Sequence, residues 1–142
     1  MNARNRFGAG ALMGLALALC TGGAAVADIL VPPPDSPSPG ASGTAQTTYD
    51  TSPSISGELL FGIYGIDAET KFQVSGLRPR TTYTFSVVDE VSWAWWLHYE
   101  VSFKTNGRGK ASGLIQWLSP SPGTAVYTVV DGSDIVVLVG QE

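Results

Sequence analysis

The sequence predicts an all-β fold, a single antiparallel β-sandwich of about 6 to 8 strands. Polar and apolar residues alternate in segments such as 71–75, 83–87 and 99–104, and a period of two places the apolar side chains of a strand on one face. β-branched and aromatic residues dominate, and Gly or Pro interrupts the longer windows, so helices are disfavoured. Residues 55–142 are enough for one hydrophobic core and too few for two.

The strands expected in this unit follow one another at short intervals. Residues 59–66 and 135–139 are apolar at successive positions, which is typical of strands covered on both faces. Asn106-Gly107 lies between residues 101–105 and 110–117, and residues 131–134, Asp-Gly-Ser-Asp, lie between 125–130 and 135–140. Both are strong turn signals, so we expect two β-hairpins. Asp131 and Asp134 are interpreted as turn formers, because calcium takes about 6 to 8 oxygen ligands.

Residues 1–27 have the pattern of a cleaved signal peptide. Arg4 and Arg6 precede an apolar stretch over residues 8–19, and residues 25–27, Ala-Val-Ala, form a signal-peptidase site. The apolar stretch is shorter than the roughly 20 residues that span a bilayer. We therefore expect a mature chain that begins at Asp28, without the sulfur-bearing residues of the signal, and a secreted or periplasmic protein.

Lipid anchoring is the alternative. Residues 17–20, Leu-Ala-Leu-Cys, resemble a bacterial lipoprotein signal, in which the cysteine is acylated, although Leu19 departs from the pattern. This resemblance implies a membrane anchor at Cys20.

Residues 28–54 are predicted to be a disordered linker or arm. They hold six of the nine prolines and few large apolar side chains, so they cannot bury enough surface to offset the entropy of folding. The boundaries that we expect are therefore a signal peptide over 1–27, a Pro/Ser/Thr-rich linker over 28–54 and the β-sandwich over 55–142.

The charge disfavours polyanionic partners. The formal net charge is −4, and loss of Arg4 and Arg6 with the signal peptide takes it to −6. Nucleic acids and anionic membranes are bound through Lys and Arg clusters. Along the sequence the nearest approach to a cluster is Arg78 with Arg80 and Arg108 with Lys110, which we interpret as two solvated hairpin ends. We expect no nucleic-acid partner and no membrane insertion after signal cleavage.

Residues 74–83, Val-Ser-Gly-Leu-Arg-Pro-Arg-Thr-Thr-Tyr, resemble the inter-sheet crossing of fibronectin type III domains, which ends in a tyrosine corner. The resemblance implies that Leu77 plugs the core, that Pro79 shapes the crossing, and that the Tyr83 hydroxyl bonds to upstream backbone. It implies only a structural role for Thr81. In that family most strands precede this segment, whereas here most follow it. The resemblance therefore implies an immunoglobulin-like sandwich, and a transthyretin-like sandwich remains open.

The segment with functional character is residues 92–100, Ser-Trp-Ala-Trp-Trp-Leu-His-Tyr-Glu, which contains three of the four tryptophans. On a strand, its odd-numbered residues share one face and its even-numbered residues share the other. One face can enter the core, while the other can stack on sugar rings or anchor a protein interface. A purely structural role, with the first two tryptophans in the core, is the alternative. The candidate contact residues are Trp93, Trp95, Trp96, His98 and Tyr99.

Catalysis is not expected. His98 and Glu100 are two residues apart, but the mature chain has no cysteine and no serine in a nucleophile elbow. One histidine without cysteine is a poor zinc site. Asp89 and Glu90 are adjacent, so on a strand their carboxylates point to opposite faces. We expect no enzyme, no metal and no cofactor.

The function expected is that of an exported, non-catalytic binding module whose surface lies around residues 93–99. Its partner would be another extracellular protein or a glycan, the latter making it a carbohydrate-binding module. The alternative is a structural component of an envelope or extracellular matrix that assembles through sheet edges. The strand at 135–139 motivates it, because no Lys or Pro guards that edge. Such an edge is either covered within the fold or available for assembly in trans.

Overall fold

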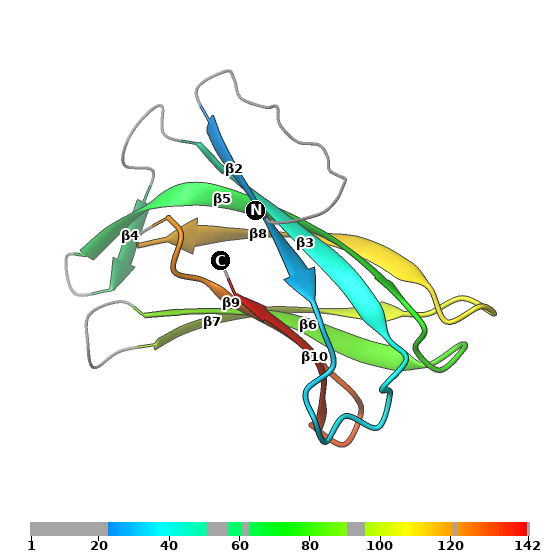
Figure 1. The fold of residues 1–142 in the computed structure, drawn as a ribbon. Coiled ribbons are helices and arrows are strands. Elements are labelled where there is room, and N and C mark those ends of the chain that lie inside the picture. The colour runs from blue at the N-terminus through cyan, green and yellow to red at the C-terminus, as the bar shows by residue number, and fades with distance from the viewer. Residues whose placement is uncertain (1–22, 51–56, 61–62, 91–95, 121, 142) are drawn as a thin grey trace.

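The structure is a computed structural model that describes residues 23–50, 57–60, 63–90, 96–120 and 122–141. These residues form an all-β sandwich of two antiparallel sheets, as the sequence predicts (Figure 1). Within the described ranges no element is a helix, and accordingly no helix there could cross a membrane.

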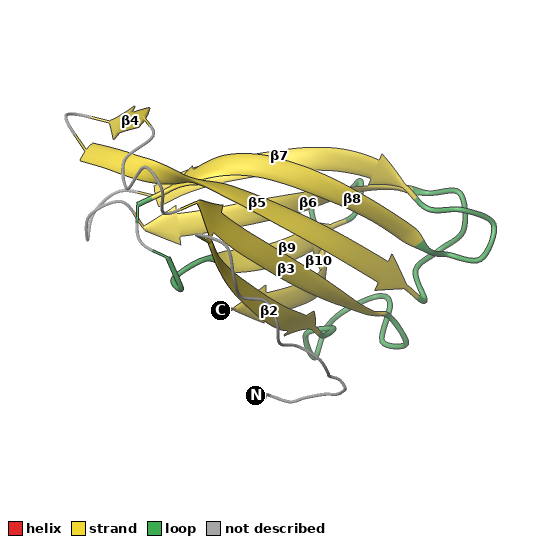
Figure 2. Ribbon diagram, turned by 90° about the horizontal axis from the view of Figure 1, so that it is seen from above, coloured by secondary structure: helices red, strands yellow, loops and turns green. Residues whose placement is uncertain are grey.

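The two sheets differ in size. The five-stranded sheet contains β2 (Gly23–Leu30), β3 (Ser42–Asp50) and β5 (Ile63–Ser75) in that order, and both β8 (Ala111–Ser119) and the short β4 (Gly57–Leu60) pair with β5. The four-stranded sheet has the order β10 (Val136–Gln141), β9 (Val126–Val130), β6 (Thr82–Glu90) and β7 (Trp96–Lys104). Figure 2 shows β4 at one end of the sandwich. Without β4, the described strands match the predicted number of about 6 to 8.

Aromatic rings from both sheets fill the space between them. Phe72 of β5 stacks on Phe85 of β6 with ring centroids 4.2 Å apart and an interplanar angle of 8°. Phe85 in turn stacks on Tyr127 of β9. Gly113 of β8 leaves room for the Phe72 ring, because a Cβ there would lie 2.5 Å from the ring's Cζ. The alternation that predicted β5 and β6 thus places their apolar faces in one core.

Ser42–Asp50 forms strand β3, so the predicted disorder of residues 28–54 is wrong over these nine residues. Ala45, Thr47 and Tyr49 are buried there. The buried Thr47 hydroxyl bonds to those of Thr70, at 2.7 Å, and of Tyr127. Hydroxyl pairing therefore replaces the large apolar side chains that the composition lacks. Residues 51–54 lie outside the described part of the chain.

The proline-rich segment before β3 covers the edge of β10. Val31 and Val139 exchange two backbone hydrogen bonds, of 3.0 and 2.8 Å. The Ser36 hydroxyl donates to the carbonyl of Val137 at 2.9 Å. Since Pro has no N–H, it suits a segment that runs along a sheet edge without continuing the ladder. This segment guards the edge that the sequence left unguarded.

Strand β2 crosses the predicted signal-peptidase site. Its residues from Asp28 to Leu30 pair with Ala45 to Gly43 of β3, and Leu30 is fully buried. Cleavage after Ala27 stays a prediction. The described sheet thus includes residues that precede 55, and a chain cut after Ala27 would keep Asp28–Leu30 in it.

The crossing from β5 to β6 contains the contact expected of a tyrosine corner. The backbone N–H of Arg78 donates to the Tyr83 hydroxyl at 3.1 Å, and both Leu77 and Tyr83 are buried. The contact is local. The resemblance did not imply membership of the fibronectin type III family, and the immunoglobulin-like sandwich that it implied stays a prediction.

One of the two predicted hairpins forms. Residues 131–134 connect the antiparallel pair β9 and β10, and Asp131 Oδ1 accepts hydrogen bonds from the N–H groups of Ser133 and Ile135. The prediction of a hairpin at Asn106-Gly107 is wrong, because β7 pairs with β6 whereas β8 pairs with β5. Asn106 still forms a turn, since its Oδ1 accepts from the N–H groups of Arg108 and Lys110. That turn crosses between sheets.

Candidate binding surface

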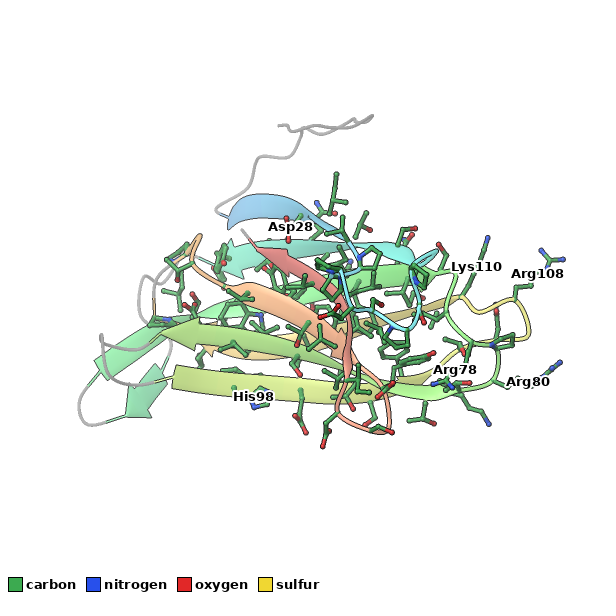
Figure 3. The ribbon with its side chains drawn as sticks, turned by 60° about the horizontal axis from the view of Figure 1, so that its bottom comes forward. Asp28, Arg78, Arg80, His98, Arg108 and Lys110 are labelled. Atoms are coloured by element: carbon green, nitrogen blue, oxygen red, sulfur yellow. The ribbon has the colours of Figure 1, made fainter. Side chains whose placement is uncertain are left out.

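The predicted contact segment is only partly described. Trp93 and Trp95 lie outside the described residues, and Trp96 is the first residue of β7, its side chain also outside them. His98 is exposed, and its Nε2 lies 3.3 Å from a Glu100 carboxylate oxygen. The predicted alternation holds for the last two candidates, since His98 faces solvent (Figure 3) and Tyr99 packs on the core.

Tyr99 is half-buried against β8. Its ring is 6.1 Å from that of Trp117, at 45°. Burial raises the pKa of the Tyr99 phenol above 10.0, and a hydrogen bond with the Leu118 backbone acts in the opposite direction. Tyr99 of β7 therefore contacts β8 of the other sheet, so the position of its ring depends on both strands.

Asp89, which the sequence offered as a possible acid or base, lies inside the fold and contacts a neighbouring hydroxyl. It is buried, and its Oδ1 accepts a hydrogen bond of 2.5 Å from the Thr124 hydroxyl. Among the described residues, no group of three His, Cys, Asp or Glu side chains is placed to hold a metal ion.

The outer face of β3, β5 and β8 carries a band of polar side chains, which we call the polar strip. Strand register aligns these side chains in rows across the three strands, and most of them are exposed. One row is Thr44, Gln73 and Ser112; the next is Gln46 and Lys71 with the exposed, apolar Leu114; the third is Thr48, Glu69 and Gln116.

A hollow lies at each end of the polar strip. The first, of about 530 Å³, is bordered by hydroxyl, amide and ammonium groups, among them Ser42, Gln73, Asn106 and Lys110. The Ser42 and Ser75 hydroxyls lie 3.3 Å apart in it. These groups can both donate and accept hydrogen bonds, which suits a ligand rich in hydroxyls.

The second hollow, of about 740 Å³, is acidic. Asp50, Asp67 and Glu69 line it together with Gln116 and Tyr99. The Gln116 amide donates to Glu69 at 3.4 Å. Tyr99 is thus the predicted contact residue that the structure places beside the polar strip.

Sequence reasoning missed the polar strip because β3 was taken as linker. A signal was present, since Ser42, Thr44, Gln46 and Thr48 alternate with small or buried residues at a period of two. The rows themselves depend on the pairing of strands far apart in the sequence.

The loops at the first hollow bring the four basic residues together. These side chains are exposed, as expected of solvated ends, but the expected hairpins are wrong because both turns cross between the sheets. Arg78 and Arg80 lie in the β5–β6 crossing, and Arg108 and Lys110 in the β7–β8 crossing; Figure 3 shows all four at one end of the molecule. The crossings are joined by backbone hydrogen bonds, from Leu77 N–H to the Gly109 carbonyl and from Arg80 N–H to the Asn106 carbonyl. We call this end, residues 76–81 with 105–110, the basic end.

In comparisons with known proteins, no family model, no curated protein and no solved structure matches the chain.

Proposed function

We propose that this chain is an exported, non-catalytic binding module and that the polar strip is the surface that contacts its ligand, an extended glycan chain. The observation that carries the proposal is the alignment of exposed hydroxyl and amide side chains in rows between two hollows.

The chemistry of the polar strip supports a sugar ligand. Hydroxyl and amide groups donate and accept hydrogen bonds, as sugar hydroxyls do. From Thr44 to Thr48 the strip runs about 13 Å at about 3.3 Å per residue, so a short oligosaccharide can lie along it. Because the side chains stand on paired strands, little backbone ordering is needed on binding.

Export is the second part of the proposal. The signal-like residues 1–27 support release to the periplasm or the medium, and Cys20 supports the alternative of a lipid-anchored protein. The intact mass of the exported protein distinguishes the two, because acylation retains Cys20 whereas signal-peptidase cleavage begins the chain at Asp28.

Assembly through sheet edges is less well supported. Its motivation was an unguarded C-terminal strand, and the contacts of Val31 and Ser36 cover the edge of β10. Contact through β7 retains some support, since His98 and Glu100 are exposed on that strand.

The test is glycan binding by the purified exported protein. A double variant, Thr44→Ala with Gln73→Ala, removes two of the three side chains in the first row of the polar strip. Both positions are exposed, and substitutions at such positions usually change stability by less than about 0.5 kcal/mol. We expect at least a tenfold loss of glycan affinity. Ser102→Ala, an exposed substitution on β7, is the matched control and leaves the affinity unchanged.

The same experiment separates the alternatives. Equal binding by the double variant and the native protein would rule out the polar strip. Loss of binding in His98→Ala instead would assign the contact to β7.

A further inference from the structure

We infer that the ligand is an acidic polysaccharide whose carboxylate or sulfate groups bind the basic end while its hydroxyls bind the polar strip. The inference rests on the proposed function and names its ligand class. It starts from the two crossings, which bring four cations together from distant parts of the chain.

The basic end is a rigid platform. Besides the two backbone bonds between the crossings, Thr105 N–H donates to the Thr81 carbonyl at 3.0 Å. The buried Thr105 hydroxyl donates to the Arg78 carbonyl at 2.5 Å and accepts from Thr81 N–H at 3.0 Å. The backbone that carries the cations is therefore fixed before a ligand arrives, which lowers the entropic cost of binding.

Arg80 reaches from one crossing to the other. A Cβ on Gly107 would lie 3.1 Å from its Nη2, so the guanidinium sits directly over that glycine. The backbone of Arg80 has φ 51°, an uncommon conformation for a residue other than glycine, and the hydrogen bond to Asn106 holds it there. Arg80 thus presents its charge beside the crossing that carries Arg108.

Most of this positive charge is not neutralised. Arg78 Nη2 lies 4.0 Å from an Asp131 carboxylate oxygen. Within the described ranges no carboxylate lies within 4.0 Å of Arg80, Arg108 or Lys110. In a chain of net charge −4, three such cations at one end attract an anion that the rest of the surface repels.

The basic end is continuous with the polar strip. Asn106 and Lys110 belong to the β7–β8 crossing and also line the first hollow, beside Ser42 and Gln73. A polymer can therefore place its acidic groups on the crossings and its hydroxyls on the rows. Asp50, Asp67 and Glu69 at the far hollow repel acidic groups, so such a chain has a preferred direction.

Other polyanions fit these features less well. Single-stranded nucleic acids bind where aromatic rings stack on bases next to basic groups, and the first hollow is bordered by Ser, Thr, Gln, Asn and Lys side chains together with Gly, Val and Ala.

The test compares polygalacturonate, dextran sulfate and neutral dextran as ligands of the purified exported protein. We expect the two anionic polymers to bind at least tenfold more tightly than dextran. Their affinity should fall roughly 20- to 40-fold between 50 and 200 mM NaCl, because about three charge contacts release counterions.

Charge variants locate the contact. The triple variant Arg80→Gln, Arg108→Gln and Lys110→Gln should lose at least tenfold in affinity for the anionic polymers and most of the salt dependence. Lys104→Gln removes an exposed positive charge from β7 and serves as the control. Arg108→Gln alone keeps every backbone bond of the crossings and should lose part of the affinity, which excludes unfolding as the cause.

Each outcome is informative. Equal, salt-insensitive affinity for dextran and polygalacturonate would overturn the inference and leave glycan binding intact. Failure to bind any of the three polymers would contradict the inference, and only failure with a wider set of neutral and acidic glycans would also remove the proposed function. Binding to anionic vesicles or single-stranded DNA without polysaccharide binding would overturn it in favour of another polyanion.

Discussion

The backbone N–H of Leu77 donates a hydrogen bond of 3.2 Å to the carbonyl of Gly109, and this bond joins two segments that each cross from one sheet to the other. Leu77 is also buried. The position of the four basic residues therefore depends on the same contact that closes this end of the core.

The glycine at 109 should be essential for this contact. It has φ 73°, and a Cβ there would collide with the Leu77 carbonyl oxygen. We expect Gly109→Ala to lower the free energy of unfolding by about 2 to 3 kcal/mol, measured by denaturant titration. Gly132→Ala, in a turn with no atom within 4 Å of the added methyl, is the control and should change it little. If the two substitutions changed the free energy of unfolding equally, the close contact between residues 109 and 77 would be contradicted.

The Tyr83 hydroxyl should contribute to stability independently of its ring. Tyr83→Phe keeps the stacking on Phe103 but leaves the Arg78 N–H without its acceptor. The expected loss is about 1 to 2 kcal/mol, the usual cost of an unsatisfied, partly buried donor. An unchanged denaturation midpoint would show that water replaces the hydroxyl at no cost.

Thr47 should behave as a core residue. Thr47→Val keeps its shape but deprives the Thr70 and Tyr127 hydroxyls of a partner, and we expect a loss of about 1 to 3 kcal/mol. Thr48→Val, at the next and exposed position, should change the free energy of unfolding by less than about 0.5 kcal/mol. If neither substitution had an effect, residues 42–50 would be the linker that their composition suggests.

Stability should fall at high pH through Tyr99. Burial raises the pKa of the folded state above the 10.0 of an exposed phenol, so the unfolded chain ionises first. The contribution is therefore present below pH 10 and is lost as the pH rises through the pKa of the folded state. We expect Tyr99→Phe to be less sensitive to alkali, as measured by unfolding at pH 8 and pH 11. The same alkaline loss in both proteins would assign the effect to other groups.

Local patterns predicted the fold class and the corner. Alternation in residues 71–75 and 83–87 reports which side chains face the core, because strands have a fixed period of two. The contact of Tyr83 spans only a few residues, so a short motif suffices to predict it.

Long-range pairing explains what the sequence could not predict. β3 was hidden because its buried face is made of Ala, Thr and Tyr rather than large aliphatic residues. Asn106-Gly107 signals a turn, but a turn does not determine which neighbours its flanking strands choose. The rows of the polar strip follow only once β3, β5 and β8 are in register, and the contact of Arg80 with Gly107 follows only once β5 pairs with β8 and β6 with β7.

The most direct test of glycan binding at the polar strip is a titration of the labelled exported protein with oligogalacturonate, followed by NMR amide chemical shifts. The account predicts the largest shifts at Thr44, Gln73 and Lys110, with small shifts at His98 and Glu100 on β7. Shifts confined to β7 would contradict it. So would the absence of shifts with saturating oligogalacturonate, if other glycans also produced none.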